Sequence, residues 1–131
     1  MLYLLDTNAV ISLLNDRDSR TSKRARSHQP ADVGISAIVA HELYYGAFKS
    51  QRMEINVGLV DEMQFEVVEF DKEDARQAGE VRAMLATLGT PIGPYDVLIS
   101  GQAKSRNLVL VSSNTNEFGR VPGLRTENWE I

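Results

Sequence analysis

Residues 2–8 have the sequence LYLLDTN, in which four apolar or aromatic side chains are followed by three polar ones. An unbroken apolar run is typical of a strand that is buried on both faces in a parallel sheet. Residues 8–14 then have the apolar spacing of a helix, and Thr7 or Asn8 is the expected cap of its first turn. Asp6 therefore lies at the carboxyl end of a central strand and beside a helix N-terminus, where open α/β sheets hold their ligands. The alternative is that Asp6 only caps the helix.

Strand and helix patterns alternate along the rest of the chain, which favours an α/β fold with a mostly parallel central sheet. We expect a single domain over residues 1–131, with four to five strands and with helices on both faces of the sheet. Residues 53–64 have an amphipathic pattern in which Ile55, Leu59 and Met63 recur every fourth residue. Further strands are expected at residues 33–36, 66–68, 108–111 and, as a short edge strand, within 124–129, and further helices within 15–29 and at 37–49, 72–88 and 97–105.

Composition narrows the class of protein. The 131 residues include no cysteine, so we expect neither disulfides nor thiolate metal sites, and a reducing cytoplasm as the location. His28 and His41 lie far apart in the sequence, which argues against zinc. The N-terminal residues lack the pattern of a signal peptide, and no apolar run is long enough to cross a bilayer. The net charge of −4 argues against a general nucleic-acid coat protein.

Basic residues are concentrated near the N-terminus, between residues 17 and 28. A local cluster of this kind predicts a patch that contacts phosphates, although the alternative is an ordinary solvated helix face. The residues are Arg17, Arg20, Lys23, Arg24 and Arg26.

Three carboxylates and one amide occupy positions that an α/β topology brings to one edge of the sheet. Asp6 and Asn114 follow strands, Glu42 lies on the apolar side of the 37–49 helix, and Asp96 lies in the first turn of a later helix. Carboxylates gathered in one crevice repel one another, and a hard cation such as Mg²⁺ or Mn²⁺ removes that repulsion. The set therefore indicates metal-assisted hydrolysis of a phosphodiester.

Two of these carboxylates also have a purely structural interpretation. Glu42 at the edge of its apolar stripe could reach solvent or a backbone amide. Asp96 could serve only to stabilise its helix through the helix dipole. The sequence pattern alone leaves both interpretations open.

Four short motifs follow one another along the chain. They are Asp6-Thr7-Asn8 after an apolar strand, Glu42 in a helix that continues as Leu43-Tyr44-Tyr45-Gly46, Pro94-Tyr95-Asp96, and Ser112-Ser113-Asn114 followed by Glu117-Phe118. In this order and spacing they resemble the PIN-domain family and, more narrowly, the ribonuclease toxins of bacterial type II toxin–antitoxin systems, the VapC group. The resemblance covers essentially the whole chain.

The resemblance implies a Mg²⁺- or Mn²⁺-dependent endoribonuclease that inhibits translation by cutting structured RNA, with tRNA anticodon loops as the favoured substrates. Asp6 and Asp96 match the principal metal ligands, and Glu42 matches a third acid that acts directly or through water. Asn114, the fourth expected catalytic residue, lies where many relatives have an acid, which puts a second tightly held metal in doubt. Polar residues that match positions orienting the acids are Thr7, Asn8 and Ser112.

The resemblance also implies protein partners. A nuclease that attacks its host's RNA must be held inactive, so we expect a VapB-like antitoxin that binds DNA with one end and wraps the toxin with the other. Its wrapping segment should lie near Tyr44, Tyr45 and Phe48 and place a basic residue among the acids, because arginine binds carboxylates bidentately. A homodimer is a further expectation.

Two other functions agree with parts of the sequence. A HAD-like phosphatase would use Asp6 as its nucleophile, but that chemistry usually needs a second Asp two residues on, where this chain has Asn8. A PIN scaffold that only binds RNA or protein would not need three acids, which are costly to bury without a metal.

Overall fold

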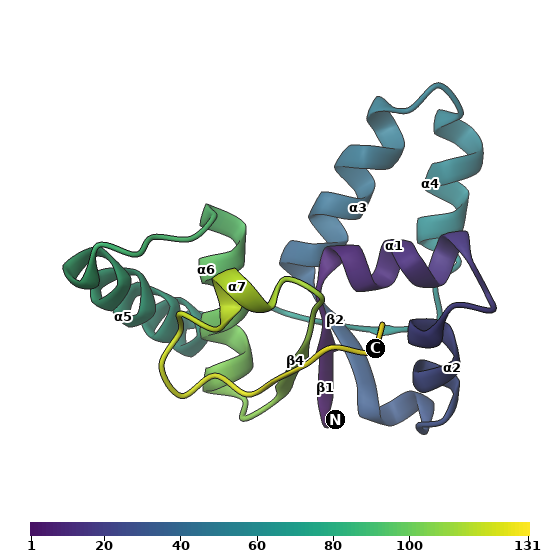
Figure 1. Ribbon diagram of the computed structural model, residues 1–131. Coiled ribbons are helices and arrows are strands. Elements are labelled where there is room, and N and C mark those ends of the chain that lie inside the picture. The colour runs from purple at the N-terminus through teal and green to yellow at the C-terminus, as the bar shows by residue number, and fades with distance from the viewer.

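β1 (Tyr3–Leu5) is the central strand of a five-stranded parallel sheet in the computed structural model, which describes residues 1–131 (Figure 1). The strand order is β3-β2-β1-β4-β5. In the register of the sheet, Leu4 of β1 lies opposite Gly34 on one side and Leu110 on the other. The remaining strands are β2 (Val33–Ser36), β3 (Glu66–Val68), β4 (Val109–Val111) and β5 (Thr126–Glu127). The predicted α/β class and parallel sheet are confirmed, and the carboxyl ends of all strands meet at one edge.

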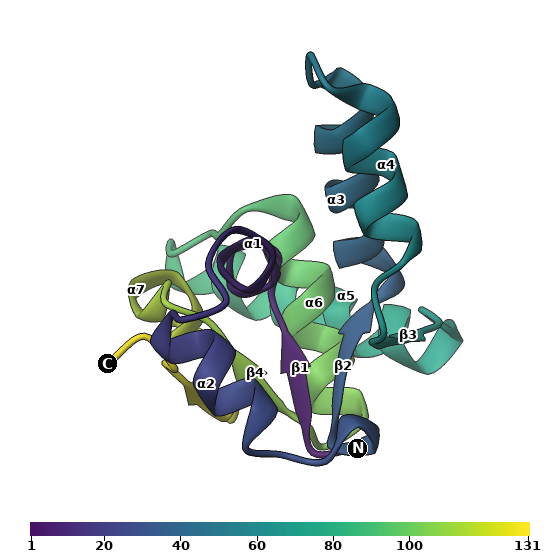
Figure 2. The same cartoon turned by 90° about the vertical axis from the view of Figure 1, so that its right-hand side faces the viewer.

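Helices cover both faces of the sheet. Figure 2 shows α1 (Thr7–Asn15) and α2 (Arg20–Arg26) in front of the strands, with α5 (Lys72–Leu88) and α6 (Pro94–Ser105) behind them. α3 (Ala37–Lys49) and α4 (Met53–Asp61) pair into a hairpin that extends beyond the sheet, and α7 (Thr115–Phe118) is a single turn after β4 (Figure 1). A short 3₁₀ turn, Pro30–Asp32, leads into β2. No helix in the structure is both long and apolar enough to span a membrane.

The main core forms around β1, as its sequence predicts. Leu4 and Leu5 are fully buried, together with Ile35 of β2 and Leu110 of β4. Trp129 closes one end of the core with only 1% of its surface exposed, in contact with the ring of Tyr3. The predicted role of Trp129 as a C-terminal anchor is thus confirmed.

Two local predictions were wrong. The cap of α1 is Asp6, since its Oδ1 accepts a hydrogen bond from the Ala9 amide at 2.8 Å, and Thr7 is already the first helical residue. α4 forms where the periodicity predicts a helix, although Ile55 and Leu59 of its apolar stripe are exposed on the hairpin. α4 also ends at Asp61, earlier than expected.

Candidate active site

A cavity of about 230 Å³ opens at the carboxyl edge of the sheet. Because neighbouring parallel strands end at this edge, residues distant in sequence meet there. The cavity is lined by Asp6, Thr7, Asn8, Glu42, Asp96, Asn114 and Phe118. The structure thus brings together all four residues expected to be catalytic and two of the three expected to orient them.

Asp6 is held rigidly at the end of β1. Only 5% of its surface is exposed, its carboxylate caps α1 through the Ala9 amide, and it also accepts a hydrogen bond from the Ser112 hydroxyl beyond the end of β4. Burial raises the pKa of Asp6 above its ordinary value of 3.8, and the negative charges of Glu130 and Glu42 add to that rise, against the two hydrogen bonds. Asp6 is therefore both a helix cap and part of the acidic cavity.

Glu42 comes to the cavity from α3. Ser36, the last residue of β2, caps this helix through the amide of Ile38 at 3.0 Å, which fixes where α3 starts. The Thr7 hydroxyl donates a hydrogen bond of 2.9 Å to Oε1 of Glu42, joining α1 to α3. The partially buried carboxylate is thus satisfied by a neutral hydroxyl rather than by a cation.

Asp96 enters from the first turn of α6, which begins at Pro94. The pKa of Asp96 is raised to about 6, first by burial, then by a hydrogen bond to the carboxyl group of Glu117, and further by the charges of Glu117, Glu42 and Asp6. The crowding of carboxyl groups at this point of the cavity therefore favours the protonated form of Asp96.

Glu117 is the acid that the sequence analysis did not place in the site. Asn114 caps α7 and holds Glu117 in two ways: its Oδ1 accepts from the Glu117 amide at 3.4 Å, and its Nδ2 donates to Glu117 Oε2 at 3.1 Å. Asn114 thus lines the cavity and also aims a fourth carboxyl group at Asp96. The spacing of three residues from Asn114 to Glu117 is that of a helix cap and its partner, and it was the signal available in the sequence.

The PIN domain family matches residues 3–124 of the chain. The chain is 40% identical over 129 residues to the tRNA(fMet)-specific endonuclease VapC of Shigella flexneri, and the match covers 97% of each protein. DNA-bound VapBC from Salmonella typhimurium contains a chain with a TM-score of 0.93 and 41% identity, covering 98% of this chain and 99% of that one. For VapBC2 of Rickettsia felis bound to a promoter fragment, the TM-score is 0.90 and the identity 33%, with coverage of 98% and 99%. This chain belongs to the PIN-domain family, in its VapC group.

In this PIN domain, each carboxyl group of the cavity forms a hydrogen bond with a different partner. No three Asp, Glu, His or Cys side chains are close enough to hold one metal ion as they stand. Asp6 is bonded to a backbone amide, Glu42 to Thr7, and Asp96 to Glu117. The donor set nevertheless suits a hard cation, because the cavity offers carboxylate and amide oxygens and no basic side chain lines it.

The five basic residues between positions 17 and 26 do not line the cavity. They lie on α2 or just before it, and two of them are engaged elsewhere: Arg24 forms a 3.3 Å ion pair with Glu127 and covers the ring of Trp129, and Arg26 donates to the Arg17 carbonyl at 2.7 Å. Arg20 and Lys23 are exposed and form no ion pair. Contact with RNA phosphates therefore remains a prediction, strongest for these last two.

The aromatic residues expected to contact an antitoxin lie on α3. Tyr45 and Phe48 are exposed, whereas Tyr44 is half-buried and donates a hydrogen bond to Asp61 of α4. A separate groove of about 220 Å³ runs between α1, α3 and α4, and Glu42 belongs to its lining as well as to that of the acidic cavity. The groove is lined by Ile11, Leu14, Asn15, Glu42, Leu43, Gly46, Ala47, Asn56, Leu59 and Val60.

Proposed function

We propose that this protein is the toxin of a type II toxin–antitoxin module, a Mg²⁺- or Mn²⁺-dependent endoribonuclease that inhibits translation by cutting tRNA in the cytoplasm. The family and the names of the relatives support ribonuclease activity, and the Shigella flexneri protein, named for tRNA(fMet), supports tRNA as the substrate. The anticodon loop is the part of tRNA that we propose is cut.

One observation carries the proposal: the acidic cavity has no compensating cation of its own. Burial first, and then the charges of neighbouring acids, raise the pKa values of Asp6 and Asp96, and no lysine, arginine or histidine lines the space. Like charges held together at the edge of a rigid sheet cost stability, and a bound divalent cation offsets that cost. Functional sites are where such perturbed groups concentrate.

The residues of the cavity have distinct proposed roles. Asp6 and Asp96 would be the principal metal ligands, with Glu42 as the third acid. A divalent ion bound there supplies activation of water and neutralisation of charge on the phosphate. Thr7 and Ser112 hold Glu42 and Asp6 in place, Asn8 lines the cavity beside them, and Asn114 fixes Glu117 next to Asp96.

The two alternative functions are disfavoured on different grounds. Membership of the PIN-domain family argues against a HAD-like phosphatase, and Asn8 occupies the position where that chemistry usually needs a second Asp. A silent binding module would have no reason to keep four carboxyl groups in mutual repulsion.

A cleavage assay on purified metal-free protein tests the proposal. We expect tRNA(fMet) to remain intact with the metal-free protein and to be cut in the loop after Mg²⁺ or Mn²⁺ is added. The Asp6→Asn variant serves as the control, since asparagine retains the ability to cap α1. If the metal-loaded wild-type protein leaves tRNA and other structured RNA intact, the proposed function is wrong.

An antitoxin would be the regulatory partner, and the VapBC structures of Salmonella typhimurium and Rickettsia felis support this proposal. We propose that an apolar segment of a VapB-like antitoxin lies along the groove between α1, α3 and α4, close to Tyr44, Tyr45 and Phe48. Because Glu42 borders both spaces, a segment following the groove arrives at the acidic cavity, where an arginine would pair with the carboxylates.

Co-purification with the neighbouring gene product, followed by Mn²⁺ titration of the complex, tests the partner. We expect a tight complex that takes up Mn²⁺ much less readily than the free toxin. Equal uptake by both would rule out an arginine among the acids while leaving the partnership intact. Sedimentation equilibrium of the free toxin will show whether it forms the expected homodimer.

A further inference from the structure

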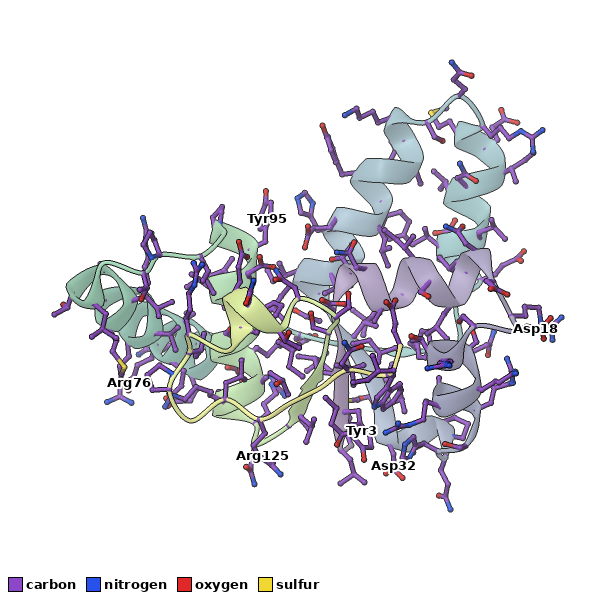
Figure 3. All side chains as sticks on the ribbon, viewed as in Figure 1. Tyr3, Asp18, Asp32, Arg76, Tyr95 and Arg125 are labelled. Atoms are coloured by element: carbon purple, nitrogen blue, oxygen red, sulfur yellow. The ribbon has the colours of Figure 1, made fainter.

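Two aromatic rings flank the acidic cavity without being part of its lining. The ring of Tyr95 meets that of His41 edge to face, with 5.6 Å between centroids. Tyr95 is 44% exposed and His41 is also exposed. Figure 3 shows Tyr95 pointing away from the sheet at the start of α6, beside α3. The aromatic pair is thus presented to solvent rather than buried.

The chain ties each ring to an acid of the cavity. His41 directly precedes Glu42 on α3, and Tyr95 directly precedes Asp96 on α6. Successive residues of a helix point in different directions, so each helix sends its acid into the cavity and its ring to the rim. In an RNA whose phosphate enters the cavity, a single sugar separates that phosphate from the nearest base. Because each ring directly precedes an acid of the cavity in the sequence, this base comes close to the rings.

We propose that Tyr95 and His41 form a stacking platform for an unpaired RNA base next to the scissile phosphate. The inference rests on the proposed ribonuclease function and adds a substrate-positioning site to it. RNA-binding proteins commonly hold splayed-out bases of loops on the faces of Tyr, Phe, Trp and His.

Electrostatics explains why such a platform is needed. The cavity is acidic, the protein has a net charge of −4, and the basic residues of α2 lie away from the cavity. Apart from the proposed divalent cation, charge therefore contributes little attraction for RNA at the point of cleavage. Base stacking does not depend on charge and tolerates any base, because every base has a π-face. It would also require an unpaired base, which favours loops over duplexes.

The test measures RNA binding in the Asp6→Asn background, so that the RNA stays intact, with Mg²⁺ present. The probe is a single-stranded oligonucleotide with the anticodon-loop sequence of tRNA(fMet), compared with a series in which one position at a time is abasic. Tyr95→Ala is compared with Tyr95→Phe, which keeps the ring. Leu88→Ala is the matched control, since Leu88 is 61% exposed and lies on α5.

We expect Tyr95→Ala to weaken binding about 5- to 150-fold, the range for loss of one base–aromatic stack, and Tyr95→Phe and Leu88→Ala to change it little. One or two abasic positions should weaken binding to the parent protein by a similar factor and should have little further effect with Tyr95→Ala. In the cleavage-competent protein, Tyr95→Ala should raise KM more than it lowers kcat.

The platform would be overturned if Tyr95→Ala bound RNA as tightly as the parent protein. It would also be overturned if removal of a base from the oligonucleotide weakened binding equally with and without the Tyr95 ring. Loss of antitoxin binding without loss of RNA binding would assign the rings to the protein partner and overturn it as well. If wild-type protein cuts tRNA and Tyr95→Ala binds RNA normally, only this inference fails. If wild-type protein neither binds nor cuts RNA, the proposed function fails with it.

Discussion

Asp6 shows how one residue can meet a structural and a functional requirement together. Its backbone ends β1, its carboxylate caps α1, and the same carboxylate lines the acidic cavity. The cap interaction needs an acceptor oxygen, whereas the proposed metal site needs a negative charge. A substitution that keeps the oxygen and removes the charge separates the two requirements.

We predict that Asp6→Asn and Asp96→Asn each reduce RNA cleavage by more than about 100-fold, since loss of residues that merely support metal ligands already costs about 10- to 100-fold. The metal-free variants should be as stable as the wild type or more so, because each change removes like-charge repulsion and asparagine still caps α1. Urea unfolding of the metal-free proteins measures this. A large loss of stability in either variant would favour the structural interpretation of these acids.

The raised pKa of Asp96 predicts how the stability gained by the Asp96→Asn variant depends on pH. Its pKa is 3.8 ordinarily and about 6 in the folded protein, so its favourable contribution is complete below 3.8 and is lost as the pH rises through 6. Asp96→Asn should therefore exceed the wild type in stability at pH 7, on the order of 1 kcal/mol after allowance for solvent screening. The advantage should shrink below pH 6, and an advantage that grows on acidification would contradict the assignment.

Most residues of the site could be predicted from the sequence, and one was missed. Asp6 and Asn114 could be found because residues that end parallel strands share an edge, and Glu42 because a carboxylate on the apolar side of a helix needs a partner. For Asp96 the pattern alone did not exclude a purely helix-stabilising role, and its place in the site was expected from the resemblance. Glu117 was missed, because the cap spacing from Asn114 to Glu117 indicates a helix turn but does not show that this turn aims the carboxyl group at Asp96.

The contact between α5 and α6 is the most extensive between two helices, and it depends on Gly101. A methyl group at this buried position would overlap the backbone of Ala78 in α5. We predict that Gly101→Ala destabilises the protein by about 1–3 kcal/mol or more, because neither backbone can give way cheaply. Since α6 carries Asp96, cleavage should fall as well.

Gly79→Ala on the same pair of helices is the matched control for that substitution. Gly79 lies within α5, and apart from the adjoining backbone of that helix no atom lies within 4 Å of the added methyl group. Alanine there should stabilise the protein by about 0.5–1 kcal/mol through its higher helix propensity. Thermal unfolding distinguishes the two, and equal effects would contradict the packing argument.

α2 provides a prediction about RNA binding. Replacing Arg20 and Lys23 by alanine should weaken binding to single-stranded RNA and reduce the slope of log K against log salt by about 0.7 for each phosphate that is no longer neutralised. Arg24→Ala, made separately, also loosens Glu127 and Trp129, so its effect is partly structural. Arg76→Ala on α5 is the control. An unchanged salt slope would make the basic run an ordinary solvated face.

Element boundaries were predictable where local signals were strong. Ser36, Asp71 and Gly89 delimit helices as expected, the last with a φ of 70° that suits glycine. The exposed stripe of α4 was not predictable, because periodicity shows that a helix has an apolar face and not what covers it. In this chain the α3–α4 hairpin leaves that face open.

Across the molecule as a whole, charge and shape are divided between regions. The sheet edge gathers acids, α2 carries a run of basic residues, and the α3–α4 hairpin presents apolar side chains beside a groove. This division suits a nuclease whose catalytic site, RNA contacts and inhibitor contacts must be distinct yet adjacent. Glu42 is the residue at which the groove and the acidic cavity meet.

The chemistry of the cleaved RNA ends is the sharpest test of metal-assisted hydrolysis in this cavity. If a metal-activated water attacks the phosphate, the ribose 2′-hydroxyl takes no part, so cleavage should leave a 5′-phosphate and a 3′-hydroxyl and should stop in EDTA. The fragments can be identified by mass spectrometry after digestion of tRNA(fMet) with Mg²⁺. A 2′,3′-cyclic phosphate, or cleavage that persists in EDTA, would contradict hydrolysis by a metal-activated water.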